Sequence, residues 1–125
     1  MDLSTISLFH ICLSMIRPDL NPDNEPAALT NLTYPELVEM IDLICEVDTE
    51  DEVVDYYAQT IELTLPGAQI LDLFYWPDEW FQDPAQKEID LDSHDMAKYI
   101  LAWTKATLPG AENLTLPEIP ATKKD

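Results

Sequence analysis

TYPELVEMIDLICEV, Thr33 to Val47, is the stretch that decides the fold class. It opens with the form of a capping box, in which a hydroxyl caps the helix N-terminus and Glu36 reaches back to the capping residue. Pro35 falls in the first turn, where its missing N–H leaves no helix hydrogen bond unmade. Leucine, methionine and isoleucine then recur at helical spacing. The stretch therefore predicts a helix of about three turns that ends near Val47.

A second helix is expected from TEDE, Thr49 to Glu52, to about Leu65. TEDE repeats the capping-box form, and its acids suit the positive end of the helix dipole. The helix carries two apolar stripes, where one is usual for an amphipathic helix. Either the helix is wedged between two neighbours, or the second stripe is an exposed patch that meets another protein. The first stripe contains Tyr56, Thr60 and Leu63, and the second contains Val53, Val54, Tyr57 and Ile61.

The rest of the domain is expected to hold one short and one long helix. Residues 68–74 allow at most a turn or two of helix, residues 76–92 are expected to form a long acidic loop, and a last helix begins near Asp92 or Ser93. The tripeptide LPG, at residues 65–67 and again at 108–110, is expected to stop the second and last helices. The pattern predicts an all-α fold, a small and irregular four-helix bundle.

The chain divides into three parts around this bundle. Residues 1–29 are expected to be an N-terminal extension and linker, residues 30–110 the helical domain, and residues 111–125 a flexible tail. The apolar N-terminal segment lacks a basic n-region and is too short to span a membrane, so we expect neither a signal peptide nor a membrane anchor. Cys12 and Cys45 are far apart and indicate neither a disulfide framework nor a zinc site. These features predict a cytoplasmic protein with reduced cysteines.

Composition argues against catalysis and against nucleic-acid binding. The net charge of −19 repels nucleic acid and anionic lipid, and it suits a basic protein partner. With two glycines in the chain, a phosphate-binding loop is nearly excluded, and no HExxH or nucleophile elbow occurs. His94, which lies near two acids, is interpreted as an exposed histidine at a helix start. We therefore expect no enzyme activity, no metal and no cofactor.

The stretch DLFYWP, Asp72 to Pro77, is the most distinctive surface candidate. Tyrosine and tryptophan offer apolar faces with one polar group each, and such residues are common anchors of protein interfaces. We expect Phe74 to close one end of the bundle, and Tyr75 and Trp76 to be exposed.

Three segments resemble the immunity proteins of nuclease colicins and pyocins. Residues 32–49 resemble that family's first helix, DLFYWP resembles its short third-helix motif, and residues 96–110 resemble its fourth helix. The resemblance implies a distorted antiparallel four-helix bundle with a very short third helix. It also implies a protein, monomeric alone, that forms a heterodimer with a cognate nuclease toxin of basic surface and inhibits it. That toxin is typically an HNH-type DNase, and binding protects the producing cell.

The resemblance also assigns a partner-binding site, with a second helix that selects the partner and a third helix that supplies common binding energy. Trp76 replaces a usual tyrosine, Ile61 replaces a common acid, and the Trp80 and Phe81 loop either extends the contact or caps the core. A DNA-mimicking acidic inhibitor of a restriction protein or another nucleic-acid-binding protein is the alternative. The selecting residues would be Glu50, Asp51, Val53, Val54, Tyr57 and Ile61, and the anchors Asp72, Tyr75, Trp76 and Pro77.

Overall fold

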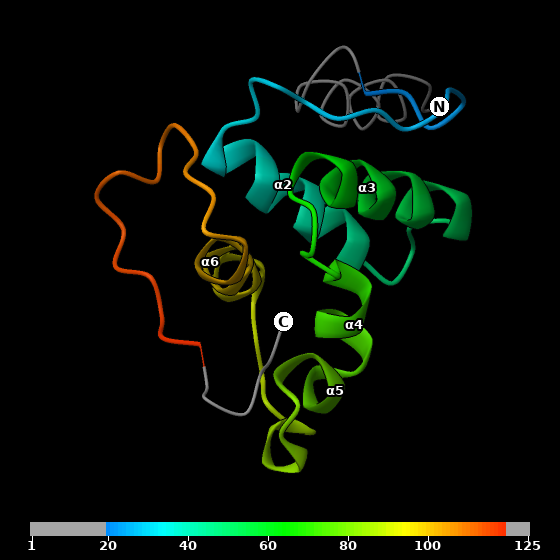
Figure 1. Ribbon diagram of the computed structural model, residues 1–125. Coiled ribbons are helices and arrows are strands. Elements are labelled where there is room, and N and C mark those ends of the chain that lie inside the picture. Colours follow the sequence, from blue (N-terminus) through cyan, green and yellow to red (C-terminus); the bar gives the residue numbers. More distant parts are fainter. Residues whose placement is uncertain (1–19, 120–125) are drawn as a thin grey trace, which may run out of the picture.

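The computed structural model describes residues 20–119 and contains only helices and connecting segments within that range (Figure 1). Residues 1–19, with Cys12, and residues 120–125 lie outside it, so the expectations for most of the N-terminal extension stay predictions. The all-α fold class is confirmed. The described elements are α2 (Tyr34–Cys45), α3 (Asp51–Thr64), α4 (Ile70–Tyr75), α5 (Pro77–Phe81), the 3-10 turn η1 (Pro84–Gln86) and α6 (Ser93–Thr104).

Helix α2 begins as the sequence predicts. The Thr33 hydroxyl accepts a hydrogen bond from the Glu36 backbone N–H at 3.4 Å, and the Glu36 carboxylate accepts one from the Thr33 N–H at 3.0 Å. This reciprocal pair confirms the capping box. The helix ends at Cys45, two residues before the predicted end, and Val47 in the following turn is 98% exposed.

Helix α3 begins differently from the prediction, because TEDE does not form a capping box. The N-cap residue is Glu50, which makes no side-chain cap hydrogen bond. The Thr49 N–H instead donates to the Glu46 carbonyl at 3.3 Å, so Thr49 belongs to the turn that leaves α2. Asp51 and Glu52 lie in the first turn of α3, where their charges are favourable to the helix dipole.

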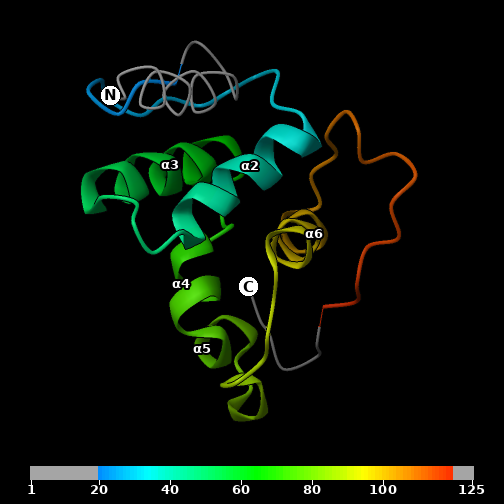
Figure 2. The ribbon, with the colours of Figure 1, turned by 180° about the vertical axis from the view of Figure 1, so that it is seen from behind.

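The helices pack around one core. Helix α2 packs against both α3 and α6, and α4 packs against α3, α5 and α6. In Figures 1 and 2, α2 and α3 lie side by side across the view, while α6 is seen end-on. Helices α4 and α5 lie below α2 and α3 in both views, beside α6.

The segment expected to be a long acidic loop contains helix α5 and the turn η1. Pro77 is the first residue of α5, where proline is well tolerated. Trp80 is 1% exposed, and its indole N–H donates to the Ala68 carbonyl at 2.9 Å. The Trp80 ring meets the rings of Phe81 and Tyr99 edge to face, with centroids 4.9 and 6.2 Å away. Of the two alternatives for Trp80 and Phe81, capping of the core is the one observed.

The second LPG tripeptide does not stop the last helix. Helix α6 ends at Thr104, and Lys105 follows in the left-handed conformation with φ of 60°. The tripeptide instead docks on the start of α2, where the Tyr34 N–H donates to the Pro109 carbonyl at 2.8 Å. A Cβ atom on Gly110 would lie 2.9 Å from Cδ of Pro35, so only glycine fits this contact without displacement. The prediction was wrong here because a local terminator pattern cannot distinguish a helix end from a tertiary contact.

Residues 20–31, here named the strap, run alongside α3 (Figure 1). The Asn21 N–H donates to the Tyr56 hydroxyl at 3.0 Å, and the Leu29 N–H donates to the Thr64 hydroxyl at 2.9 Å. Leu20 and Leu29 pack against the core. The strap is therefore attached to the helical domain near both of its ends, at residues 20–21 and at Leu29.

Cys45 at the end of α2 gives a pH-dependent prediction. Burial, followed by the nearby negative charge of Asp42, raises the pKa of the Cys45 thiol to about 11. A Cys12→Ser variant should therefore react with iodoacetamide at pH 8 roughly 100-fold more slowly when folded than when unfolded in urea, because the thiolate is the nucleophile. Since the folded pKa lies above the unfolded value of about 8.5, this group's contribution to stability is present below that pH and is lost as pH rises toward 11. Equal alkylation rates for folded and unfolded protein would contradict the burial of this thiol.

Candidate protein-binding site

Both apolar stripes of α3 are largely buried, which corrects the expectation of an exposed patch. Val54, Tyr57 and Ile61 of the second stripe are buried in the core, and Val53 is half-buried. On the first stripe, Tyr56 is buried and accepts the hydrogen bond from the strap. Helix α3 is thus wedged between the core and the strap, the other alternative that its pattern allowed. Val54, Tyr57 and Ile61 are unavailable to a partner in this fold.

The solvent-facing side of α3 is mostly polar, and most of its residues were not predicted to select a partner. Its apolar member, Leu63, belongs to the first stripe and is 51% exposed. Its residues recur every three or four positions, the spacing of one helix face. This periodicity was visible in the sequence, but it was masked by the more conspicuous apolar stripes. Glu50 and Asp51, assigned to the site by the resemblance, are exposed at the helix start. The exposed stripe consists of Glu52, Asp55, Gln59 and Leu63.

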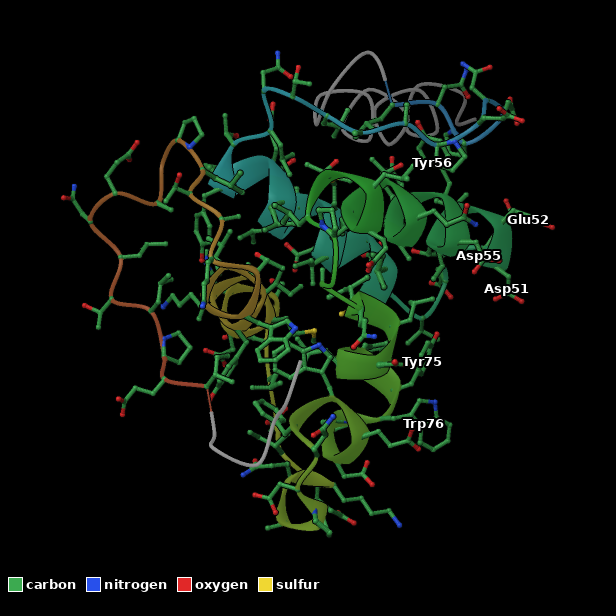
Figure 3. All side chains as sticks on the ribbon, viewed as in Figure 1. Asp51, Glu52, Asp55, Tyr56, Tyr75 and Trp76 are labelled. Atoms are coloured by element: carbon green, nitrogen blue, oxygen red, sulfur yellow. The ribbon has the colours of Figure 1, made fainter. Side chains whose placement is uncertain are left out.

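Tyr75 and Trp76 are exposed, as the sequence predicts. They are 54% and 56% exposed at the end of α4, although most large apolar residues of the described chain are buried. In Figure 3 their side chains lie on the same side of the molecule as those of Asp51, Glu52 and Asp55. The acidic start of α3 and the aromatic end of α4 therefore share one face.

The other two predicted anchors differ from each other. Asp72 is exposed, and because it lies three residues before Tyr75 in α4, these two residues share one side of the helix. Pro77 is buried, which contradicts its assignment as a partner contact. Pro77 is the first residue of α5, and its ring is on the buried side of that helix. Phe74 is half-buried and packs against the core, in agreement with its expected role.

A groove of about 300 Å³ separates α3 from α4 on this face. Its walls combine carboxylates and carboxamides with small apolar side chains. The lining residues are Asp55, Ala58, Gln59, Glu62, Gln69, Ile70, Leu71 and Asp72.

Glu62 holds the turn that joins the two walls of the groove. One carboxylate oxygen accepts from the Gly67 N–H at 2.7 Å, and the other accepts from the Gln69 N–H at 2.8 Å. Gln69 is the N-cap residue of α4 and has a left-handed backbone, with φ of 51°. Glu62 thus fixes the direction in which α4 leaves the turn, and with it the position of Tyr75 and Trp76.

Replacing Glu62 with alanine should lower the free energy of unfolding by about 2 kcal/mol, because two charge-assisted hydrogen bonds are lost at a partly buried site. Urea denaturation measures the effect. Glu52→Ala is the matched control, since it removes an exposed glutamate from the same helix and should cost less than about 0.5 kcal/mol. Equal costs for the two variants would show that the Glu62 contacts do not hold the turn.

The charge around this face is of one sign. Between Arg17 and Lys87 the sequence contains no lysine, arginine or histidine, whereas aspartate and glutamate occur throughout. This interval includes α2, α3, α4 and α5. The face therefore generates a negative potential that attracts a basic surface.

The described residues contain no clustered set of metal ligands. Residues 20–119 contain no group of three or more potential metal ligands. His94 is exposed but its Nδ1 forms a 3.1 Å hydrogen bond with the Tyr34 hydroxyl, which joins the start of α6 to α2. Among the same residues, no helix combines the length and hydrophobicity needed to cross a bilayer.

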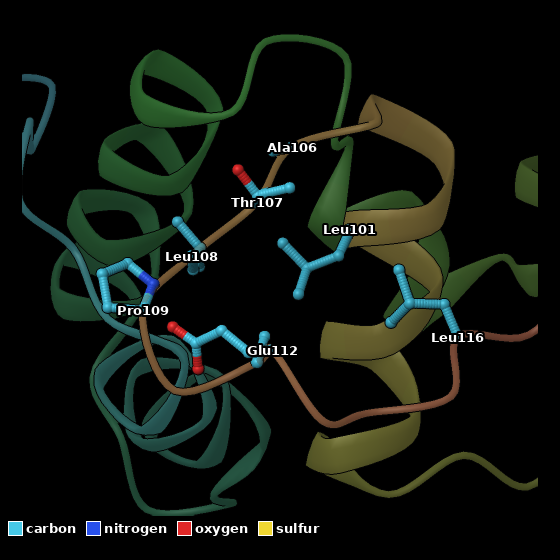
Figure 4. Close-up of a pocket in the computed structure, with 8 residues that line it drawn as sticks. Leu101, Ala106, Thr107, Leu108, Pro109, Glu112 and Leu116 are labelled. Atoms are coloured by element: carbon cyan, nitrogen blue, oxygen red, sulfur yellow. The ribbon is translucent and has the colours of Figure 1, made fainter.

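A cavity of about 440 Å³ between α6 and the following segment also lacks catalytic groups (Figure 4). Its lining is mostly apolar, and Glu112 is its one charged residue. The Glu112 carboxylate accepts a hydrogen bond from the Gly110 N–H at 3.0 Å. Without a second titratable group, this cavity offers no acid–base pair.

Comparison with known proteins yields no relative, since no protein family, no curated protein and no solved structure matches the chain.

Proposed function

We propose that this protein binds and inhibits a nuclease with a basic surface, as an immunity protein does for a bacteriocin nuclease of the HNH type. The observation that carries the proposal is the exposed pair Tyr75 and Trp76 beside an acidic groove. More than half of each aromatic side chain is in contact with water, which costs free energy that burial against a partner would recover. The motif containing this pair is also the part of the sequence that most resembles the immunity family.

The two kinds of residue on this face have different tasks in the proposed complex. Tyr75 and Trp76 supply affinity by burial, as aromatic residues do at the centre of interfaces. Asp51 and Asp55 attract the basic partner and accelerate association. Inhibition requires no catalysis, because a bound acidic protein beside the nuclease active site excludes DNA by bulk and by charge. The complex is a heterodimer formed in the cytoplasm, and the protein itself binds neither DNA nor a membrane.

Mimicry of DNA is the second candidate function. It is favoured by the long interval between Arg17 and Lys87, which contains acidic residues and no basic ones. A DNA mimic uses charge without needing an aromatic anchor, and its affinity falls steeply with salt. An aromatic-anchored complex retains much of its affinity at high ionic strength, since burial of apolar surface is not screened.

The proposal is tested by nuclease inhibition. The purified protein is titrated into the basic, metal-dependent DNase fraction of the producing cells, and cleavage of plasmid DNA is followed. We expect cleavage to stop at one equivalent of inhibitor. Unchanged cleavage in a large excess of the protein would refute the proposed inhibition of a DNase.

A further inference from the structure

We propose that the α3–α4 groove receives an arginine side chain of the partner. The inference rests on the proposed function for the identity of that partner, but the chemistry of the groove can be tested without it. The groove runs between Asp55 on one wall and Asp72 on the other.

The floor of the groove suits an aliphatic stem. Ala58 and Ile70 line it and are buried, and Leu71 adds a half-buried apolar side chain. Arginine and lysine both carry a run of methylene groups that packs well on such a surface while the charged end stays near water. A purely apolar ligand fits less well, because the rim of the groove is polar.

The rim of the groove selects a cation. Asp55 and Asp72 are exposed carboxylates that come from different helices, and both line the groove. Glu62 also lines the groove, but its two carboxylate oxygens already accept backbone hydrogen bonds. Asp55 and Asp72 are therefore the two carboxylates that face an incoming side chain.

Arginine fits this arrangement better than lysine. A guanidinium group has five N–H donors in a planar fork and can bond to two carboxylates at once, whereas an ammonium group acts as a point charge. It also stacks on aromatic faces, and the exposed Tyr75 lies three residues after Asp72 on α4, about one helical turn away. An aromatic face is therefore close to the Asp72 wall of the groove.

The test is a titration of ¹⁵N-labelled protein with the blocked peptide Ac-Gly-Arg-Gly-NH₂, followed by backbone amide NMR shifts. The same peptide with lysine or with neutral citrulline in place of arginine provides the comparison. We expect saturable shifts centred on residues 55–62 and 69–72, at least 3-fold tighter binding for arginine than for lysine, and no binding of the citrulline peptide. Shifts spread evenly over the acidic surface, no shifts, or equal binding of the citrulline peptide would overturn the proposal.

A pair of charge-matched variants locates the binding. Asp55→Asn with Asp72→Asn should weaken the arginine peptide at least 5-fold. Glu39→Gln with Asp42→Asn removes the same charge from exposed positions on α2 and should leave its affinity within 2-fold of wild type. Equal weakening by both pairs would show that net charge alone is responsible. Because no nuclease is present, failure here would leave the inhibition assay unaffected, and failure of that assay would leave this result standing.

Discussion

Trp80→Ala is expected to lower the free energy of unfolding by about 3–5 kcal/mol, the range for removal of a large aromatic side chain from a packed core. Trp80 is 1% exposed, and its ring contacts Phe81, Tyr99 and Trp103. The substitution also removes the indole donor to the buried Ala68 carbonyl, which would then be left without this hydrogen bond. Because domains of this size are stable by only about 5–15 kcal/mol, this loss is a large share of the total stability. Equilibrium urea denaturation followed by circular dichroism measures the loss.

Trp76→Ala is the matched control, because it removes the same side chain from an exposed position four residues earlier in the chain. Its cost should stay within about 1 kcal/mol, in the range of surface substitutions. If the two tryptophan variants lost similar amounts of stability, then helix α5 would not cap the core and Trp80 would not be buried in solution.

The double variant Tyr75→Ala, Trp76→Ala should bind the nuclease at least about 30-fold more weakly than wild type. Truncation of one interface anchor costs at least about 2 kcal/mol, and the losses at two adjacent anchors do not simply add. Most of the effect should appear in the dissociation rate, since the acids that accelerate association are unchanged. Surface plasmon resonance with immobilised nuclease resolves the two rates.

Asp51→Asn provides the contrasting result in the same experiment. Its carboxylate is exposed at the start of α3, so its loss should slow association several-fold at low salt and change dissociation little. A folded aromatic double variant that binds as tightly as wild type would show that the partner contacts another face.

The elements defined by local chemistry were predicted well. The Thr33–Glu36 capping box, the tolerated Pro35 and the helical spacing of apolar residues lie within one segment, and the structure contains the predicted helix α2. The predicted start of the last helix near Asp92 or Ser93 is also confirmed, and Asp92 and Asp95 form a reciprocal cap there. In such segments the sequence itself carries the hydrogen-bond partners.

The elements that depend on distant contacts were predicted less well. The strap bonds to residues 35 positions further along the chain, so nothing near Tyr56 or Thr64 indicates that α3 is covered on that side. The sequence predicts a loop where α5 forms, because Pro77 and the acids after it are typical of loops, although proline is equally suited to a helix start.

The residues of the candidate site also fall into two groups, those whose exposure was predicted correctly and those whose burial was not predicted. The exposure of Tyr75, Trp76 and Asp72 followed from aromatic residues placed among acids on a short helix. Burial of Ile61 and Pro77 did not follow, because apolar residues on two helix faces are compatible with either a second interface or a second packed neighbour. The helical spacing of the exposed stripe of α3 is visible in the sequence, but only the burial of Val54, Tyr57 and Ile61 shows that the stripe is the side that faces solvent.

Capture at high salt tests the central claim, that Tyr75 and Trp76 anchor a basic nuclease, most directly. Wild-type protein and the Tyr75→Ala, Trp76→Ala variant are immobilised, exposed to lysate of the producing cells, washed at about 1 M salt to screen charge attraction, and analysed by mass spectrometry. We predict that the wild-type column retains one basic nuclease, which is inhibited by the free protein, and that the variant column retains none. Loss of all basic proteins from both columns in the salt wash, or equal retention of the nuclease by both, would contradict the account.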